Sequence, residues 1–273
     1  MKIRVKIIHI RSGNSNKINK NQKIKTKKRG NKLLVATVTF LVMILSLGIM
    51  ALVTPVFNIQ EIKVEGNDKV TTTNIINLSR IKIGENIFRN NKKKIEKNIK
   101  ENPYIESVLI KRILPSTINL QICERKVEYQ IKLISSYIYI DKSGNILENS
   151  NSKENVLTLE GYETTEDSLI NEDKLYEVDR NKLDKVAKIK ESLKSIENFD
   201  ESETIINIKD ENNFIIYLKS ENKKIYIGDT TNLSSKMLYI KKILENEKEH
   251  SGKIFINGDL NGGFRPYFRE ENI

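Results

Sequence analysis

The sequence predicts an α+β protein with a basic tail, one membrane-spanning helix and two small domains, the second built on a mainly antiparallel sheet. The membrane helix is predicted by residues 33–57, which contain no charged side chain in 25 positions. Residues 58–127 alternate strand-like and helix-like segments in the order β-α-α-β-β. Residues 128–260 carry strand-like runs interrupted by two amphipathic helices, and residues 261–273 are expected to form a C-terminal tail.

The charge of the chain is concentrated in its tail. The net charge of +11 comes from 47 basic and 36 acidic residues, and residues 1–32 hold 12 of the basic ones and no acidic one. The other 241 residues are nearly neutral, so a basic nucleic-acid-binding domain is not indicated. We expect the tail to contact anionic lipid, at about 1 kcal/mol per cation near the surface. Binding of nucleic acid or a cytosolic partner by the tail is the weaker alternative.

The apolar run is long enough to be an uncleaved transmembrane anchor. At about 1.5 Å per residue, some 20 residues cross the ~30 Å hydrocarbon core of a bilayer. A cleaved signal peptide would have a shorter apolar region followed by a small-x-small cleavage site. The candidate site here, Ser46-Leu47-Gly48, lies inside the run, which favours the anchor over the signal peptide and over a buried core helix.

The distribution of basic residues predicts the orientation of this helix. Cytoplasmic flanks carry an excess of Lys and Arg. The flank before the helix is strongly basic, whereas residues 58–72 hold two lysines against three carboxylates. The N-terminus is therefore expected in the cytoplasm, with residues 58–273 outside the cell membrane.

The first domain begins with a predicted strand and a short helix. Residues 57–66 alternate apolar and polar positions and stop at Gly66-Asn67, which indicates a strand and a turn. Thr71 is a suitable N-cap for the helix that follows. Gly84 then breaks the chain before the next segment.

The second half of this domain is a predicted helix and a hairpin. Asn91 is expected to cap the helix, which should end at Asn102 because Pro103 follows. Residues 105–113 and 117–124 are rich in β-branched residues and are joined by a turn at Leu114-Pro115-Ser116.

The second domain is predicted to contain eight strands and two helices. An acidic stretch, 162–180, is expected to be a surface loop. Core-facing helices are expected at 182–197 and 232–247 because their apolar residues recur on one stripe. The expected strands are 129–134, 137–141, 145–148, 155–160, 204–209, 213–219, 223–227 and 253–257.

Residues that could carry catalysis or bind a metal are few. One Cys and two His exclude a disulfide framework and a multi-ligand zinc site. Cys123 lies in a predicted strand and His250 at a polar helix end, and neither has an evident catalytic partner. No nucleotide-binding or protease motif is present, and Gly258–Gly263 lacks the lysine of a phosphate loop. The sequence therefore predicts no enzyme and no cofactor.

Several segments together resemble a known family. They are Ile62–Asn67 (IKVEGN), Gly84–Phe88 (GENIF), Asn102–Arg125, 139–147 (YIDKSGNIL) and 228–244. In this order, behind a membrane anchor, they resemble the FtsQ/DivIB family of bacterial cell-division proteins. In that family a POTRA domain, β-α-α-β-β, follows the anchor directly. The residues of this chain that match its structural motif are Gly66, Gly84, Arg112, Pro115, Glu124 and Arg125.

The resemblance implies a non-catalytic divisome scaffold at the division septum. Its expected partners are small single-pass proteins of the FtsL and FtsB/DivIC types and, indirectly, the septal peptidoglycan synthase. The four charged or proline positions of the motif also have a purely structural interpretation, a hairpin turn with a cross-strand ion pair of about 0.2–1 kcal/mol. We favour that role over direct partner binding.

The partner-binding surface is predicted at the C-terminal end of the second domain. The strand 253–257 is the last one predicted, so its outer edge should be free to pair with another chain. The residues of this hypothesis are Lys253, Ile254, Phe255, Ile256, Phe264, Tyr267 and Phe268. The alternative is that these aromatic residues fold back and seal the core.

Two other function classes remain open at this point. A POTRA-bearing export or assembly factor would normally have tandem POTRA repeats or a β-barrel, and neither is visible. A membrane-anchored cell-wall-modifying enzyme would need two facing carboxylates. Pairs such as Glu201/Glu203 or Glu270/Glu271 could supply them only across a cleft.

Overall fold

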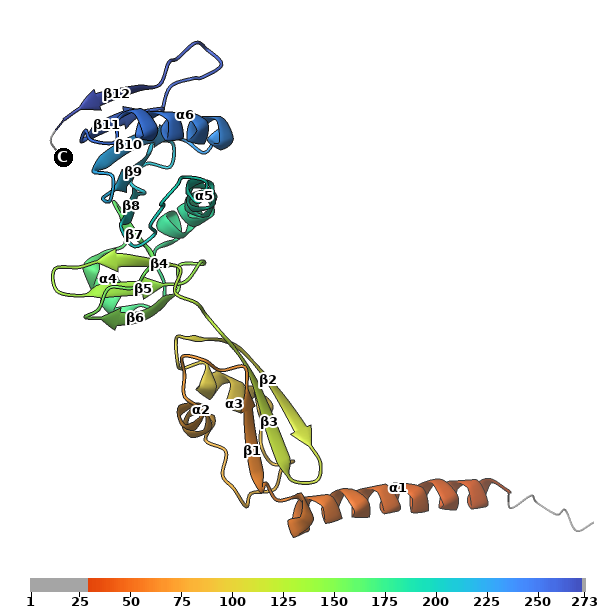
Figure 1. The fold of residues 1–273 in the computed structure, drawn as a ribbon. Coiled ribbons are helices and arrows are strands. Elements are labelled where there is room, and N and C mark those ends of the chain that lie inside the picture. Colours follow the sequence, from red (N-terminus) through yellow and green to blue (C-terminus); the bar gives the residue numbers. More distant parts are fainter. Residues whose placement is uncertain (1–28, 272–273) are drawn as a thin grey trace, which may run out of the picture. The chain divides into compact units, whose positions relative to one another are not determined.

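The structure, a computed structural model, describes residues 29–271 of the chain (Figure 1). The predicted basic tail, 1–32, therefore lies almost entirely outside the described residues. The first element is the helix α1 (Arg29–Val53), and Lys32–Val53 is long and apolar enough to cross a membrane. The helix ends at Val53 and not at residue 57, because Pro55 disfavours helical backbone in Thr54. A single 3-10 turn, Pro55–Phe57, follows.

The first domain has the predicted element order and a three-stranded sheet. Strand β3 lies in the centre, parallel to β1 and antiparallel to β2. The β2–β3 turn contains a cis peptide bond between Leu114 and Pro115. The elements are β1 (Glu61–Glu65), α2 (Thr72–Ser79), α3 (Lys92–Ile99), β2 (Ile105–Ile113) and β3 (Thr117–Glu124).

Both helices of this domain begin at the predicted caps. Thr71 Oγ1 accepts a hydrogen bond from Asn74 N at 3.3 Å, and Asn91 Oδ1 accepts one from Lys93 N at 3.0 Å. Each cap satisfies a backbone N–H group that would otherwise lack a partner in the first turn. The helix α3 ends at Ile99, three residues earlier than expected, and a turn leads from it to Pro103.

The second domain is built on one nine-stranded mixed sheet. Its strand order is β12-β11-β10-β9-β8-β7-β4-β5-β6. Most neighbouring strands are antiparallel, as predicted, but β4–β7, β7–β8 and β10–β11 are parallel. The strands are β4 (Tyr129–Lys132), β5 (Tyr137–Ile140), β6 (Ile146–Ser150), β7 (Leu157–Glu160), β8 (Thr204–Asn207), β9 (Phe214–Leu218), β10 (Lys223–Gly228), β11 (Gly252–Phe255) and β12 (Tyr267–Glu270).

Three helices, α4 (Glu166–Asn171), α5 (Glu177–Leu193) and α6 (Leu233–Asn246), complete the domain. The helices α5 and α6 pack on the sheet (Figure 1), and their apolar stripes contribute to its core. Val186, Ile189 and Ile240 are fully buried. On the opposite face, Tyr139 of β5 and Leu147 of β6 join the core of the first domain. The two domains therefore share buried apolar surface.

The segment 162–180 is not the surface loop that its acidic composition predicts. It contains α4 and the first residues of α5, and the side chain of Asp179 is completely buried. Asp179 accepts hydrogen bonds from Glu163 N at 2.9 Å, Thr164 N at 2.8 Å and Thr164 Oγ1 at 2.7 Å. These donors replace water around the carboxylate, so an acidic residue can be buried here.

The C-terminal residues also differ from the prediction. They were expected to form a tail after the last strand, but Tyr267–Glu270 form β12, which pairs antiparallel with β11. The outer edge of β11 is therefore covered. The prediction that β11 is the free edge of the sheet is wrong.

Candidate functional site

The two side chains best suited to catalysis, Cys123 and His250, are both exposed. Cys123 lies 3.7 Å from Glu106 Oε2 on the surface of the first domain. His250 Nδ1 lies 3.1 Å from Glu270 Oε1, and this hydrogen bond raises the pKa of His250. A nucleophile needs a base beside it and a cleft that excludes water. Neither contact supplies both, and the described residues hold no cluster of three metal-binding side chains.

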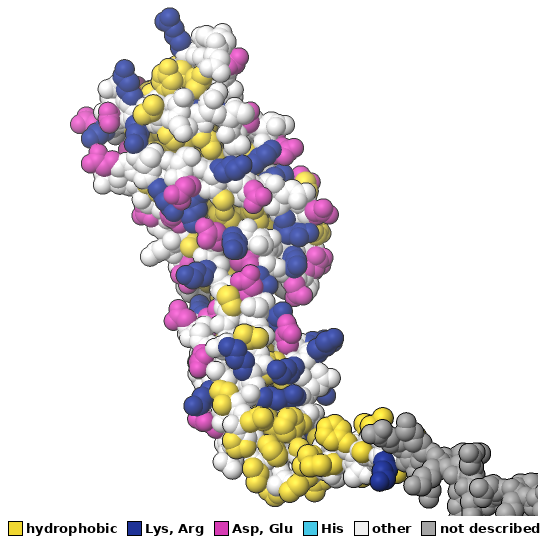
Figure 2. All heavy atoms as spheres, turned by 90° about the vertical axis from the view of Figure 1, so that its right-hand side faces the viewer, with side chains coloured by type: hydrophobic (Ala, Val, Ile, Leu, Met, Phe, Trp, Pro, Cys, Tyr) yellow, Lys and Arg dark blue, Asp and Glu magenta, His cyan; other side chains and the backbone are white. Residues whose placement is uncertain are grey.

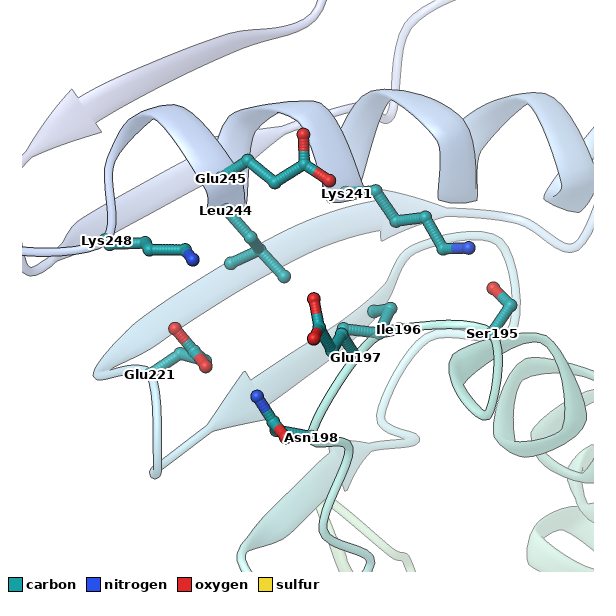
Figure 3. Close-up of a pocket in the computed structure, with 9 residues that line it drawn as sticks. All are labelled: Ser195, Ile196, Glu197, Asn198, Glu221, Lys241, Leu244, Glu245 and Lys248. Atoms are coloured by element: carbon teal, nitrogen blue, oxygen red, sulfur yellow. The ribbon is translucent and has the colours of Figure 1, made fainter.

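A small pocket lies between the end of α5 and the helix α6 (Figure 3). Its volume is about 200 Å³, and its lining includes Glu197, Glu221, Lys241 and Lys248. Ser195 is the only hydroxyl among the lining residues, and its Oγ donates to Ser192 O at 2.8 Å. The lining has no histidine, so the pocket offers carboxylates and ammonium groups without an activated nucleophile.

The pair Glu124-Arg125 of the family motif lies at the junction of the two domains. Glu124 accepts hydrogen bonds from Lys69 N at 2.8 Å and Val70 N at 3.0 Å. These donors lie in the loop between β1 and α2, more than 50 residues away in sequence. Glu124 thus holds that loop against the end of β3.

Arg125 links the first domain to the second through Asp141. Arg125 Nη1 donates to Asp141 Oδ2 at 2.8 Å, and the Asp141 side chain is only 5% exposed. Burial alone would raise the pKa of Asp141, but hydrogen bonds from Asn145, Arg125 and Ser143 outweigh it and lower the pKa. Tyr104 Oη reinforces the junction by donating to Glu148 Oε2 at 2.6 Å.

The remaining motif residues shape the loops of the first domain. Arg112 Nη2 donates to Asn90 O at 2.6 Å, and its guanidinium lies 5.9 Å from the ring centre of Phe88. Gly66 has a φ of 82°, and a Cβ there would collide with the carbonyl oxygen of Ile122. The motif residues therefore do not form the expected cross-strand ion pair with one another. None of the ion pairs among the described residues joins two of them.

The residues predicted to bind partners lie on β11, on β12 and between them. Ile254 and Ile256 are buried in the core. Phe255 stacks between two tyrosines, with ring centres 4.8 Å from those of Tyr226 and Tyr267. Lys253 Nζ binds Glu271 Oε1 at 2.6 Å.

The aromatic residues after β11 divide between the two interpretations of the sequence. Phe268 packs against the core of the second domain, whereas Tyr267 is 44% exposed. Phe264 lies against Gly258, and its ring centre is 6.4 Å from that of Tyr267. One aromatic residue therefore seals the core, while the others form a surface row.

The edge of the sheet is β12, and its hydrogen-bonding pattern shows which groups face outward. Glu271 N donates to Ser251 O at 3.1 Å, so residues 271 and 251 form a hydrogen-bonded pair. Such pairs alternate in an antiparallel ladder. Residues 267 and 269 therefore direct their backbone groups toward β11, while Phe268 and Glu270 direct theirs outward.

The sequence carries only a weak signal for this edge strand. In Tyr267–Glu270, Phe268 is the apolar position that faces the core, between the polar or exposed Tyr267 and Arg269. That alternation is a strand signal, although four residues are too few for it to stand out. The partners of Arg125 and Asp179 had no such signal, because each contact depends on the tertiary fold.

Comparison with known proteins identifies the first domain. Residues 57–125 match the family model for the POTRA domain, FtsQ-type. The cell division protein DivIB of Clostridium botulinum (strain Hall) is 34% identical over 154 residues, which cover 56% of this chain and 60% of the relative. DivIB of Clostridium acetobutylicum is 44% identical over 94 residues, covering 34% of this chain and 38% of the relative.

A relative from another genus gives a similar result. The cell division protein FtsQ of Corynebacterium glutamicum is 34% identical over 116 residues, covering 42% of this chain and 52% of the relative. In each of these three relatives the chain therefore spans 60% of the length or less. The chain thus contains an FtsQ-type POTRA domain and is similar, over 34% to 56% of its length, to the cell division proteins DivIB and FtsQ.

Proposed function

We propose that this protein is a non-catalytic component of the cell-division machinery, an adaptor that binds other membrane proteins of the divisome. The names of its relatives support a role in cell division, since they are cell division proteins. The observation that carries the adaptor role is the outer edge of β12. An adaptor needs an exposed recognition surface and no buried acid–base pair.

The edge of β12 suits recognition of an extended peptide. Outward N–H and C=O groups at Phe268 and Glu270 can form the main-chain hydrogen bonds of an added strand. The exposed ring of Tyr267, in the row with Phe255 and Tyr226, offers side-chain contacts beside that strand. Aromatic side chains of this kind are frequent hot spots of binding energy.

The opposite edge of the nine-stranded sheet is less open. There Ile146 N donates to Asp173 O at 2.8 Å, and Asn145 forms a bridge with Lys174. In the part of the chain that the structure describes, no such segment lies along the outer side of β12. We therefore infer that the partner adds its strand along the outer edge of β12.

We assign the parts of the chain as follows. Residues 1–32 are a cytoplasmic tail that binds anionic lipid, α1 crosses the cell membrane, and the POTRA domain occupies 58–127 outside it. The second domain begins at 128 and extends to β12, beyond the limit of 260 predicted from sequence. The partners are small single-pass proteins of the FtsL and FtsB/DivIC types at the division septum. Through them the protein influences septal peptidoglycan synthesis.

One backbone substitution tests the edge directly. Glu270→Pro removes an outward N–H group without removing a hydrogen bond to β11, and proline is tolerated on edge strands. Full-length protein with this change should capture the FtsL-type and FtsB/DivIC-type proteins of its own cell at least about tenfold less well, which equals ~1.4 kcal/mol. Co-purification from detergent-solubilised membranes measures the capture.

Two matched variants separate backbone from side-chain effects. Glu270→Ala removes the same carboxylate, including its contact with His250, but keeps the N–H group, so capture should persist. Arg269→Pro removes an N–H group directed toward β11 and should lower the melting temperature. If Glu270→Pro captures both partners as well as the unmodified protein does, strand addition at β12 is wrong.

A further inference from the structure

One end of the POTRA domain exposes large apolar side chains. Ile83 is 61% exposed, Leu114 57%, Val56 56% and Ile113 47%. Phe88 is also exposed, and its ring lies 5.4 Å from that of Phe57. We call this surface, formed by Val56, Phe57, Ile83, Phe88, Ile113 and Leu114, the apolar end. The hydrophobic side chains at the bottom of Figure 2 also include those of α1.

Backbone hydrogen bonds hold the parts of the apolar end together. Gln60 N donates to Ser116 O at 2.9 Å, which fixes the tip of the β2–β3 hairpin. Ile59 N donates to Glu85 O at 2.9 Å and Ile87 N donates to Phe57 O at 2.9 Å, which fixes the loop of residues 83–88. Both apolar loops are therefore bound to the segment 57–60.

That segment follows α1 almost directly. Four residues lead from Val53 to Phe57. A fully extended chain spans at most about 3.6 Å per residue, so Phe57 lies within roughly 14 Å of the end of α1. If α1 crosses the bilayer and ends near its surface, the covalent chain keeps the apolar end within reach of the headgroup region.

The charge around the apolar end matches an anionic membrane surface. Residues 82–94 and 109–117 carry seven basic side chains and one acidic one, Glu85. Glu61, which contacts Thr117, is balanced by Lys63. Lys111 is exposed beside the hairpin tip, and Arg112 lies over the ring of Phe88. Apolar side chains surrounded by cations are typical of surfaces that lie in the interface of anionic bilayers.

We propose that the apolar end of the POTRA domain inserts into the outer surface of the lipid bilayer. Ile83, Ile113 and Leu114 enter the boundary between headgroups and acyl chains, and the surrounding cations bind lipid phosphates. The chain is then held at the membrane by two parts, the helix α1 and the apolar end. Together they restrict the tilt of the POTRA domain relative to the membrane. This inference rests on the proposed crossing of the membrane by α1.

The absence of tryptophan from the sequence permits a direct test. Full-length Leu114→Trp is reconstituted, without other proteins, into vesicles containing phosphatidylglycerol whose acyl chains are brominated near the headgroup. Bromine quenches tryptophan only at close range, so we expect the emission to fall at least about twofold relative to unbrominated vesicles. Leu238→Trp is the matched control, because Leu238 is 68% exposed on α6 of the second domain, and it should not be quenched.

Flotation of the vesicles distinguishes the outcomes. Quenching of Leu114→Trp alone, in protein that floats with the vesicles, supports insertion of the apolar end. If the protein floats but Leu114→Trp and a second probe, Ile83→Trp, are not quenched, α1 anchors the chain and the insertion is wrong. The apolar end would then be left for a protein partner. If the protein does not float, the proposed anchor itself fails, and the inference fails with it.

Discussion

The ammonium group of Lys236 is almost completely buried, and Asp229 supplies its counter-charge. Lys236 Nζ donates to Asp229 Oδ1 at 3.0 Å and to Asp229 O at 2.9 Å, and the Lys236 side chain is only 4% exposed. A buried charge without such a partner is strongly unfavourable. Asp229 also accepts from Thr231 Oγ1 at 2.6 Å, so one carboxylate orders the turn before α6.

This arrangement makes stability depend on acid pH. The hydrogen bond from Thr231 is the main cause that lowers the pKa of Asp229 to about 2, with Lys236 adding to it against the effect of burial. An unfolded Asp has a pKa of about 3.9. The folded state binds the proton less well, so the stabilisation is complete above about pH 4 and is lost as the pH falls toward 2.

We therefore expect Asp229→Asn to lower the melting temperature at pH 7 by several degrees. The difference from the unmodified protein should shrink between about pH 4 and pH 2, because the variant has no carboxylate to protonate there. Thermal unfolding followed by circular dichroism over this range measures it. Asp210→Asn, in an exposed turn, should change the pH 7 value little. A difference that stays constant from pH 7 to pH 2 would contradict this account.

At the scale of elements, Asp179 at the start of α5 anchors the segment that leads into α4. Its carboxylate accepts three hydrogen bonds from Glu163 and Thr164, and Thr164 Oγ1 in turn accepts one from Tyr176 N at 2.9 Å. Lys182 Nζ lies 3.6 Å from Asp179 Oδ1 and balances the charge. At least one acidic residue of this segment, Asp179, therefore stabilises a defined tertiary structure.

Asp179→Ala should destabilise the second domain by several kcal/mol, since each hydrogen bond to a charged group is worth about 1.5–3 kcal/mol. Chemical denaturation measures the loss, and hydrogen exchange should rise first in residues 162–176. Asp184→Ala, an exposed position on the same helix, should stay within about 0.5 kcal/mol of the unmodified protein. Equal effects at the two positions would show that the buried carboxylate has no anchoring role.

At the scale of the whole molecule, we predict the orientation of the chain in the membrane. Protease added to intact protoplasts should digest residues 58–273 and leave an epitope in residues 1–30 intact, because the basic flank is expected to stay in the cytoplasm. Immunoblotting with antibodies to both regions measures this. Loss of the N-terminal epitope without lysis would mean that the orientation is reversed.

The parts of the molecule that depend on neighbouring residues follow from the sequence. The presence of a long apolar helix, the capping of α2 by Thr71 and the boundaries of β2 and β3 agree with the predictions, because apolar periodicity, caps and turns act over a few residues. The first helix was predicted to end at residue 57 but ends at Val53. This difference also has a local cause, the proline at position 55.

Only the tertiary structure decided which residues meet across long stretches of chain. The short strand β12 is stable because β11 supplies its hydrogen bonds and Phe268 reaches the core. Arg125 pairs with the buried carboxylate of Asp141, where a cross-strand ion pair was expected. Asp179 accepts hydrogen bonds from backbone N–H groups, where the sequence indicated a surface loop. Burial of a polar group depends on whether the fold brings partners to it, and a local pattern carries no information about partners that distant parts of the chain provide.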